Sequence, residues 1–253
     1  MKLAEKVAVI TGGSTGIGLA IAKRFASEGA HVYITGRRQA ELDAAVLAIG
    51  GTAESARVDS ADLAQLQALF DRVKEKHGKL DILVANAGGG SLLPLGQITE
   101  EHFDDTFARN VKGTLFTVQT ALPLLGKGSS VILTGSTAAS GGTEAFSVYA
   151  ASKAASKAAV RAFARNWILD LKGRDIRVNT LSPGPIKTPG LVELVGNDAG
   201  QQQGVLDHLA SLIPMGRVGD PDEIAKAAVF LASADASFVN GIELFVDGGL
   251  RQI

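Results

Sequence analysis

A tyrosine and a lysine that could take part in proton transfer, Tyr149 and Lys153, lie four residues apart. They fall in a stretch that we predict to be a helix over residues 146–171. Side chains four apart lie on one face of a helix, one turn from each other. A lysine beside a phenol stabilises the phenolate and lowers a pKa that is usually about 10. Tyr149 could then donate a proton to a carbonyl oxygen and accept one in reverse. On spacing alone, two side chains on a solvated helix face are the commoner explanation.

A glycine cluster near the start of the chain could bind phosphate. Gly12, Gly16 and Gly18 follow the apolar residues 7–10, which are typical of a buried strand, and precede apolar residues at helical spacing. A helix N-terminus offers free N–H groups and partial positive charge, and glycines let the backbone approach an anion. The order strand, glycine turn, helix therefore indicates pyrophosphate binding, whereas the glycines alone would fit an ordinary tight turn.

The elements that must position these residues alternate along the chain. Strands are predicted at residues 7–10, 31–35, 52–58, 80–85, 130–134, 176–181 and 243–246, and helices after the glycine turn, at 39–49, at 61–77, from Thr99 onwards, at 146–171 and at 221–232. Thr99 and Asp220 are expected N-caps, and Gly50 an expected helix end. Several strands are almost continuously apolar, which indicates an α/β fold with one doubly wound parallel sheet and helices on both faces. We predict a single domain, 1–253.

Ligands of such a fold bind at the carboxyl ends of the strands. Small and polar residues follow the predicted strands there: the glycine turn, Gly36-Arg37-Arg38, Asp59, residues 86–90, Gly135-Ser136 and Pro183-Gly184. The residues after the strands are therefore the candidate site.

These motifs, taken together, resemble the short-chain dehydrogenase/reductases. The resemblance rests on TGGSTGIG at 11–18, NAG at 86–88, Asn110, Ser136, YAASK at 149–153, Pro183-Gly184 and Asp247-Gly-Gly, in this order over nearly the whole chain. The thirteen residues from Ser136 to Tyr149 also match the family's spacing. The resemblance implies a Rossmann-type fold. This chain departs from the family's usual Asn-Asn-Ala-Gly motif in having Ala85 before Asn86, and the change should be tolerated because residue 85 ends a strand.

The resemblance implies four catalytic residues. Tyr149 would be the general acid and base, and Ser136 would hold the substrate oxygen against it. Lys153 would lower the tyrosine pKa and bind the nicotinamide ribose, and Asn110 would hold a water in a proton relay. Taken alone, Ser136 would be an ordinary strand-end serine and Asn110 a helix or cap residue.

The resemblance also implies a set of residues that bind a nicotinamide dinucleotide. Asp59 would accept a hydrogen bond from the adenine amino group; its structural alternative is an Asx turn at a strand end. Residues 86–88 would lie along the adenosine ribose. Ile186 and Thr188 would face the nicotinamide carboxamide and the pyrophosphate. The full predicted set is Gly12, Ser14, Thr15, Gly16, Ile17, Gly18, Arg37, Arg38, Asp59, Ser60, Asn86, Ala87, Gly88, Tyr149, Lys153, Pro183, Gly184, Ile186 and Thr188.

The residues after the second strand favour NADP(H). An NAD site usually has an acidic residue there, bonding the ribose 2′-hydroxyl, but this chain has Gly36, Arg37 and Arg38. A guanidinium can bind a 2′-phosphate through charge-assisted bonds. We expect Arg37 to be the main contact; some use of NAD(H) stays open because the glycine turn has no second basic residue.

Composition excludes several other classes. The chain has no cysteine, so disulfides, thiol catalysis and cysteine metal sites are ruled out, and we expect no metal. A net charge of −1 argues against nucleic-acid or membrane-surface partners. No apolar run approaches the roughly 20 residues of a membrane span, and the first residues are unlike a secretory signal. We expect a cytoplasmic protein.

The substrate is expected to be a small carbonyl or alcohol in a mainly apolar pocket. Ser136, Tyr149 and Phe146 would line it, with a lid at about 188–213. Alanines at 150–159 allow close helix packing, although alanine also simply favours helix. The resemblance implies a homotetramer that uses this helix and residues 238–253.

Three alternatives remain at this point. A 3-oxoacyl-carrier-protein reductase shares the motifs and would be marked by a basic patch at the site mouth. A non-catalytic dinucleotide-binding regulator would keep the fold without turnover. A hydrolase using Ser136 would need a histidine base, and of the four histidines only His208 falls near the predicted site.

Overall fold

The computed structural model describes residues 1–91, 93–137, 145 and 147–251, with the backbone alone at 153–161 and 195. Within these residues, one parallel sheet has the order β3-β2-β1-β4-β5-β6-β7. Its strands are β1 (Val7–Ile10), β2 (His31–Gly36), β3 (Glu54–Arg57), β4 (Leu80–Ala85), β5 (Leu125–Thr134), β6 (Arg177–Pro183) and β7 (Glu243–Val246). The order reverses between β1 and β4, which opens a crevice at their carboxyl ends. The predicted α/β fold is confirmed.

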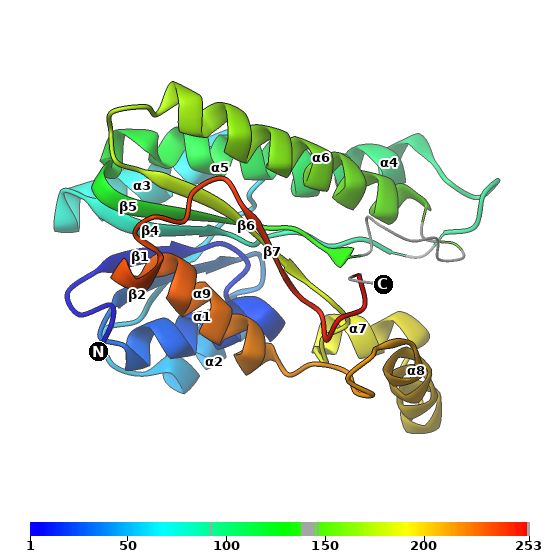
Figure 1. Cartoon of the computed structure of the whole chain (residues 1–253). Coiled ribbons are helices and arrows are strands. Elements are labelled where there is room, and N and C mark those ends of the chain that lie inside the picture. Colours follow the sequence, from blue (N-terminus) through cyan, green and yellow to red (C-terminus); the bar gives the residue numbers. More distant parts are fainter. Residues whose placement is uncertain (92, 138–144, 146, 252–253) are drawn as a thin grey trace.

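Helices cover both faces of the sheet (Figure 1). One layer holds α3 (Leu63–His77), α4 (Glu100–Phe107), the π-helical segment η1 (Ala108–Lys112), α5 (Gly113–Ala121) and α6 (Ser147–Asp170); the other holds α1 (Gly16–Ser27), α2 (Gln39–Ile49) and α9 (Pro221–Ala232). Short 3₁₀ turns occur at η2 (Leu122–Leu124), η4 (Glu193–Val195) and η5 (Ala234–Ala236). The segment with α7 (Pro189–Val192) and α8 (Ala199–Leu212) projects beyond the sheet.

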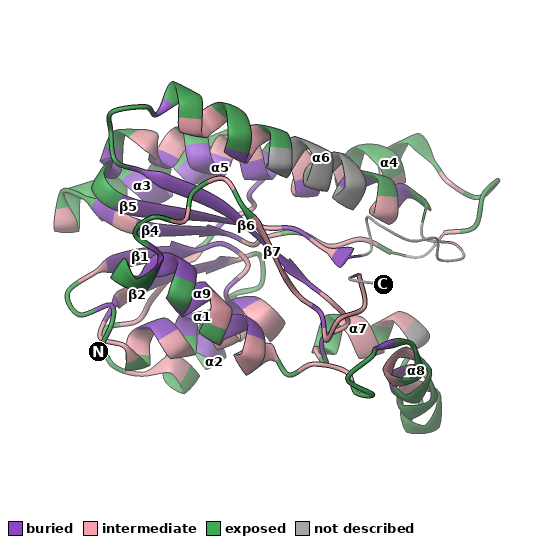
Figure 2. Cartoon of the chain, viewed as in Figure 1, coloured by how far each residue is buried: buried purple, intermediate pink, exposed green. Residues whose placement is uncertain are grey.

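Two apolar cores hold these layers together, one on each side of the sheet. Successive residues of a strand point to opposite faces. Accordingly Val7 and Val9 of β1 join the core under α3 and α5, whereas Ala8 and Ile10 join the core under α1 and α9. Figure 2 shows the buried strands between the helices. The all-apolar strand therefore anchors the glycine turn from both sides.

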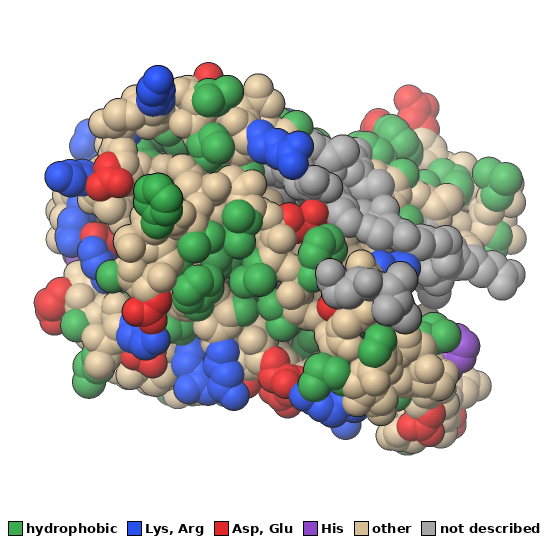
Figure 3. Space-filling view, viewed as in Figure 1, with side chains coloured by type: hydrophobic (Ala, Val, Ile, Leu, Met, Phe, Trp, Pro, Cys, Tyr) green, Lys and Arg blue, Asp and Glu red, His purple; other side chains and the backbone are tan. Residues whose placement is uncertain are grey.

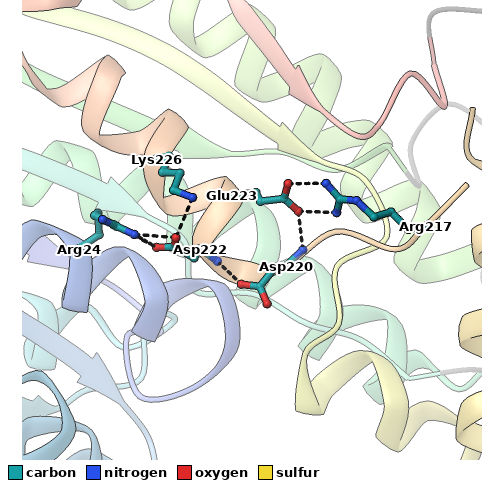
Figure 4. A network of polar contacts seen from close by, with 6 residues as sticks. All are labelled: Arg24, Arg217, Asp220, Asp222, Glu223 and Lys226. Carbon is teal, nitrogen blue, oxygen red and sulfur yellow. Dashed lines mark hydrogen bonds and ion pairs between the residues drawn. The ribbon is translucent and has the colours of Figure 1, made fainter. Parts of the chain in front are cut away.

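A polar network ties α9 to α1 (Figure 4). The Arg24 guanidinium of α1 binds Asp222 of α9, with Nε 3.0 Å from Oδ1. At the start of α9, Asp220 Oδ1 accepts from the Asp222 N–H at 2.9 Å, and Glu223 Oε2 accepts from the Asp220 N–H at 2.9 Å. Arg217 pairs with both Glu223 oxygens at 2.7 and 2.8 Å. The predicted N-cap at Asp220 is confirmed, and together with Glu223 it forms a capping box.

Local signals located most elements well. The bounds of β1, α2, β4 and β7 are as predicted, and α3, α6 and β6 differ by one or two residues. Thr99 Oγ1 accepts from the His102 N–H at 3.1 Å, which confirms that cap, and Gly50 ends α2 as expected. Side-chain caps and apolar periodicity act within a few residues, so sequence alone reveals them.

Three elements differ from the prediction. Strand β5 begins at Leu125 rather than 130. Sequence alone did not show this start, because residues 126–128 are exposed and include Gly126 and Gly128, and because the pairing with β4 has a register shift. Helix α8 was not predicted, because Leu206 is its one buried residue and its apolar pattern is weak. The helix expected from Thr99 is interrupted by the π-helical segment η1, which alters the directions in which the side chains of Arg109 and Asn110 project.

Candidate active site

The glycine turn lies at the carboxyl end of β1, where side chains would not fit. Gly12 and Gly16 have left-handed backbones, with φ of 65° and 55°. A Cβ on Gly18 would lie 2.1 Å from the Gly12 carbonyl oxygen, so α1 starts in direct contact with the turn. Thr15, the N-cap of α1, makes no side-chain capping bond within the described residues. The first N–H groups of α1 are thus available to an anion.

A hydrogen-bond clasp joins the glycine turn to the loop after β4. Asn86 Nδ2 donates to the carbonyl oxygens of Thr11 at 3.0 Å and Gly12 at 3.2 Å. In return, Thr11 Oγ1 accepts from the N–H groups of Asn86 and Ala87, each at 3.0 Å. Thr11 is buried, and sequence reasoning missed it as a site residue, although a polar residue between a buried strand and a glycine turn was a usable signal.

A cavity of about 170 Å³ opens beside this clasp and gathers much of the predicted cofactor set. It brings together Gly12, Ser14, Thr15, Arg37, Arg38, Asp59, Ser60, Asn86, Ala87 and Gly88. Thr35, Gly36, Glu41, Val58 and Arg109 line it as well, and sequence reasoning did not select them as binding residues. The cavity spans the ends of β2, β1 and β4, where the doubly wound fold places its ligand crevice.

The three arginines of the cavity have different environments. Arg38 forms an ion pair with Glu41, with Nε 2.5 Å from Oε1, and its side chain is 70% exposed. Arg37 is exposed, and no ion pair of it is found among the described residues. Arg109 comes from η1 and pairs with Asp105 four residues earlier. The sequence signal for Arg109 was its place directly before Asn110.

Asp59 has the local geometry of an Asx turn. Its Oδ1 accepts from the Ala61 N–H at 3.0 Å, and its N–H donates to Gln65 Oε1 at 2.8 Å. The carboxylate nevertheless lines the cavity, and its second oxygen keeps acceptor capacity there. The structural and the binding interpretations of Asp59 are therefore compatible.

Asn110 sits at the centre of a buried hydrogen-bond network. Its Oδ1 accepts from the Gly89 N–H at 2.9 Å, and its Nδ2 donates to the Gly89 carbonyl at 2.9 Å. Nδ2 also donates to Ser152 Oγ at 2.8 Å, and this hydroxyl donates to the Tyr149 carbonyl at 2.8 Å. Asn110 thus links the loop after β4 to the start of α6. Sequence reasoning did not select Ser152, although it stands inside the YAASK motif.

Ser136 and Tyr149 meet at the carboxyl end of β5. The Tyr149 side chain, from the first turn of α6, forms a hydrogen bond with Ser136. Burial raises the pKa of the Tyr149 phenol above its usual value, and the Ser136 bond opposes that rise. A Cβ on Gly90 would lie 2.4 Å from Tyr149 Cδ2, so the missing side chain at Gly90 lets the ring pack on the β4 loop.

The remaining predicted residues lie around this centre or outside the described part. Lys153 follows Tyr149 by one turn of α6, but its side chain is outside the described residues, as is Phe146. Thr188 caps α7 and stands next to the glycine turn, since a Cβ on Gly16 would lie 3.3 Å from Thr188 Cγ2. Ile186 lines a separate hollow of about 100 Å³.

The loop after β6 is fixed by close backbone packing. Pro183 ends β6, and Gly184 follows it with its N–H bonded to the Val246 carbonyl at 3.0 Å. A Cβ on Gly184 would lie 2.7 Å from the Asp247 Cα, so the β6 loop packs directly on the end of β7. Asp247 belongs to the Asp247-Gly-Gly motif of the sequence.

Comparisons with known proteins agree with this geometry. A family model described as "Enoyl-(Acyl carrier protein) reductase" matches residues 12–251. Oxidoreductase asL5 of Sarocladium schorii is 48% identical, covering 100% of this chain and 98% of its own. The NADP-dependent (R)-specific alcohol dehydrogenase of Lentilactobacillus kefiri is 37% identical, over 98% and 97%.

The solved structures give the same result. A short-chain dehydrogenase/reductase from Brucella melitensis superposes with a TM-score of 0.89 at 30% identity, covering 98% of both chains.

Within the described residues, none of the helices has the length and apolar character needed to span a bilayer. The chain therefore belongs to the short-chain dehydrogenase/reductase family, oxidoreductases that act on CH–OH and C=O groups.

Proposed function

We propose that this protein is an NADP(H)-dependent oxidoreductase that transfers a hydride between the nicotinamide and a small carbonyl or alcohol substrate, with Tyr149 as general acid and base. The observation that carries the proposal is the hydrogen bond between Ser136 and Tyr149 at the carboxyl end of β5. A phenol and a hydroxyl aimed at one place can bind a single substrate oxygen between them. The dinucleotide crevice lies at the same edge of the sheet.

The residues present fit a nicotinamide dinucleotide. Gly12, Gly16 and Gly18 leave the turn without side chains, and the first turn of α1 keeps N–H groups for a pyrophosphate. The cavity continues from there to Arg37 and Asp59, which suit the phosphorylated ribose and the adenine amino group. Pro183, Gly184, Ile186 and Thr188 would hold the nicotinamide half, with Thr188 already beside Gly16.

The chemistry divides between the cofactor and the chain. The cofactor, when bound, supplies or accepts the hydride. Ser136 holds the substrate oxygen, and Tyr149 gives its phenolic proton to that oxygen in reduction and takes it back in oxidation. Because burial raises the pKa of Tyr149, the phenol starts protonated, ready for reduction. Lys153 lowers the Tyr149 pKa for the reverse direction and binds the ribose hydroxyls.

Asn110 supports the proton path behind these residues. Its bonds to Gly89 and Ser152 fix the side chain. As the resemblance implies, Asn110 would hold a water in a proton relay with Lys153.

Arg37 supports the preference for NADP(H). It lines the cavity after β2, where an acidic residue would favour NAD(H), and the acidic residue nearby, Glu41, is paired with Arg38. A charge-assisted bond to a 2′-phosphate contributes about 1.5–3 kcal/mol, roughly a ten- to hundredfold preference.

The segments that we expect to wall the substrate pocket carry apolar residues. Leu93, Leu191 and Leu194 of the surrounding segments are each partly buried. Such walls favour a small, largely apolar ketone, aldehyde or alcohol over an anionic substrate.

The protein also carries surface suited to self-association, and we include a homotetramer in the proposal. The view in Figure 3 shows hydrophobic side chains grouped over the face that carries β7 and α9. Phe238 is fully exposed in the single chain, and Ile242 and Phe230 are also exposed. A surface that exposes large apolar side chains is typical of an interface.

Turnover with a panel of ketones, aldehydes and a 3-oxoacyl thioester tests the function. We expect NADPH oxidation with wild type, and Tyr149→Phe should lower kcat by roughly 10²–10⁴ while NADPH binding persists. Tyr33→Phe, which alters the other tyrosine of the chain, should keep kcat. Full activity of Tyr149→Phe would contradict the acid–base assignment, and cofactor binding without any turnover would support the regulator.

A further inference from the structure

Arg109 lines the cavity beside the glycine turn. It belongs to the π-helical segment η1, and its side chain is 22% exposed. In this π-helical turn, neighbouring side chains contact different parts of the site. Arg109 lines the cavity, whereas Asn110 forms hydrogen bonds with Gly89 and Ser152. Such segments often occur at functional sites.

The charges around Arg109 leave the cavity positive. Burial and the nearby Arg37 lower the pKa of Arg109, and Asp59 opposes them. Its own ion pair is with Asp105, which is half exposed and therefore screened by water. Two guanidiniums thus act on each other in one cavity, an arrangement that an anion between them would relieve.

We propose that Arg109 is a second cofactor-specificity residue, which joins Arg37 in binding the 2′-phosphate of the adenosine ribose. This inference rests on the proposed NADP(H) function and adds a residue of η1 that lines the same cavity as Arg37. A phosphate presents several oxygens, and the planar guanidinium fork can bind two of them, so two arginines can share one dianion. We assign this role to Arg109 rather than to Arg38, because the Arg109 side chain is 22% exposed whereas that of Arg38 is 70% exposed.

Calorimetric titration with adenosine 2′,5′-bisphosphate and with 5′-AMP tests the assignment without turnover. We expect wild type to bind the bisphosphate more tightly. Arg109→Leu should weaken bisphosphate binding by about tenfold, the effect of losing one charge-assisted bond, and leave AMP binding unchanged. Arg57→Leu is the matched control, because Arg57 is an exposed arginine at the end of β3 that is not among the residues lining the cavity, and it should alter binding of neither ligand by more than about twofold.

Each other outcome has a definite meaning. If Arg109→Leu weakens the binding of both ligands equally, the guanidinium contacts the adenine or only maintains the shape of the cavity, and the proposal is overturned. Unchanged binding of both ligands would also overturn it. If Arg109→Leu does not fold, Arg109→Lys keeps the charge without the fork and should still lose several-fold in bisphosphate binding alone; an unchanged bisphosphate affinity would overturn it. A wild-type protein that prefers neither ligand refutes the NADP(H) function itself, a separate failure.

Discussion

Gly18→Ala is expected to damage both the fold and the dinucleotide site. The new Cβ would lie 2.1 Å from the Gly12 carbonyl oxygen and 2.7 Å from Asn86 Nδ2. Backbone cannot swing aside as a flexible side chain can, so α1 and the glycine turn must separate. Overpacking of this kind costs typically 1–3 kcal/mol, and we expect about 2 kcal/mol net of the roughly 1 kcal/mol that alanine gains in a helix.

Gly204→Ala provides the matched control. Gly204 is also a helical glycine, exposed in α8, and a Cβ there would meet nothing within 4 Å. It should therefore show only the helix gain of about 0.5–1 kcal/mol.

Thermal unfolding and nucleotide titration at one protein concentration measure both effects. At about 2–4 °C per kcal/mol for a chain of this size, Gly18→Ala should lower Tm by roughly 4–8 °C and weaken NADPH binding. Gly204→Ala should raise Tm by roughly 1–4 °C with unchanged binding. Wild-type Tm and NADPH affinity in Gly18→Ala would refute the close contact between α1 and the turn.

Three further outcomes are expected. Arg37→Ala should reduce NADPH affinity roughly ten- to hundredfold with little effect on NADH, measured by nicotinamide fluorescence; equal losses would show that Arg37 does not bind the 2′-phosphate. Arg217 lowers the pKa of Glu223 to about 2 from 4.5, so the stability from this carboxylate is complete above about pH 4.5 and is lost as pH falls towards 2. Glu223→Gln should then reduce the acid dependence of chemical unfolding, by less than about 1 kcal/mol because the pair is exposed, and an unchanged slope would argue against the pair. Ser152→Ala removes a buried bond to Asn110 and one to the Tyr149 carbonyl, so it should lower stability by about 1–2 kcal/mol and reduce kcat; wild-type values of both would remove Ser152 from the site.

Sequence alone determined the elements whose signals are local. The run Val7–Ile10 is apolar throughout because it is buried on both faces, and its bounds were predicted correctly. Thr99 and Asp220 act on N–H groups two or three residues away, so their caps needed no knowledge of the fold. The order of motifs also identified the family: most of them follow strand ends, whereas Asn110 and YAASK lie in the helical segments η1 and α6.

Elements whose stability comes from distant contacts were placed less well. Helix α8 buries little apolar surface, so its periodicity is weak. The first half of β5 pairs with β4 through the buried Leu125, although the residues that follow, 126–128, are exposed and include two glycines. The π turn at η1 depends on packing with its neighbours, and no residue type in the segment predicts it.

The candidate site shows the same division. The glycine turn and the YAASK motif were predicted from sequence because the spacing of their residues within one turn or one helix is local. The meeting of Ser136 with Tyr149, the clasp between Thr11 and Asn86, and the approach of Arg109 to Arg37 join residues from different elements. Only the packed sheet and helices bring such residues within hydrogen-bonding or Coulombic range, so the tertiary structure alone decided those contacts.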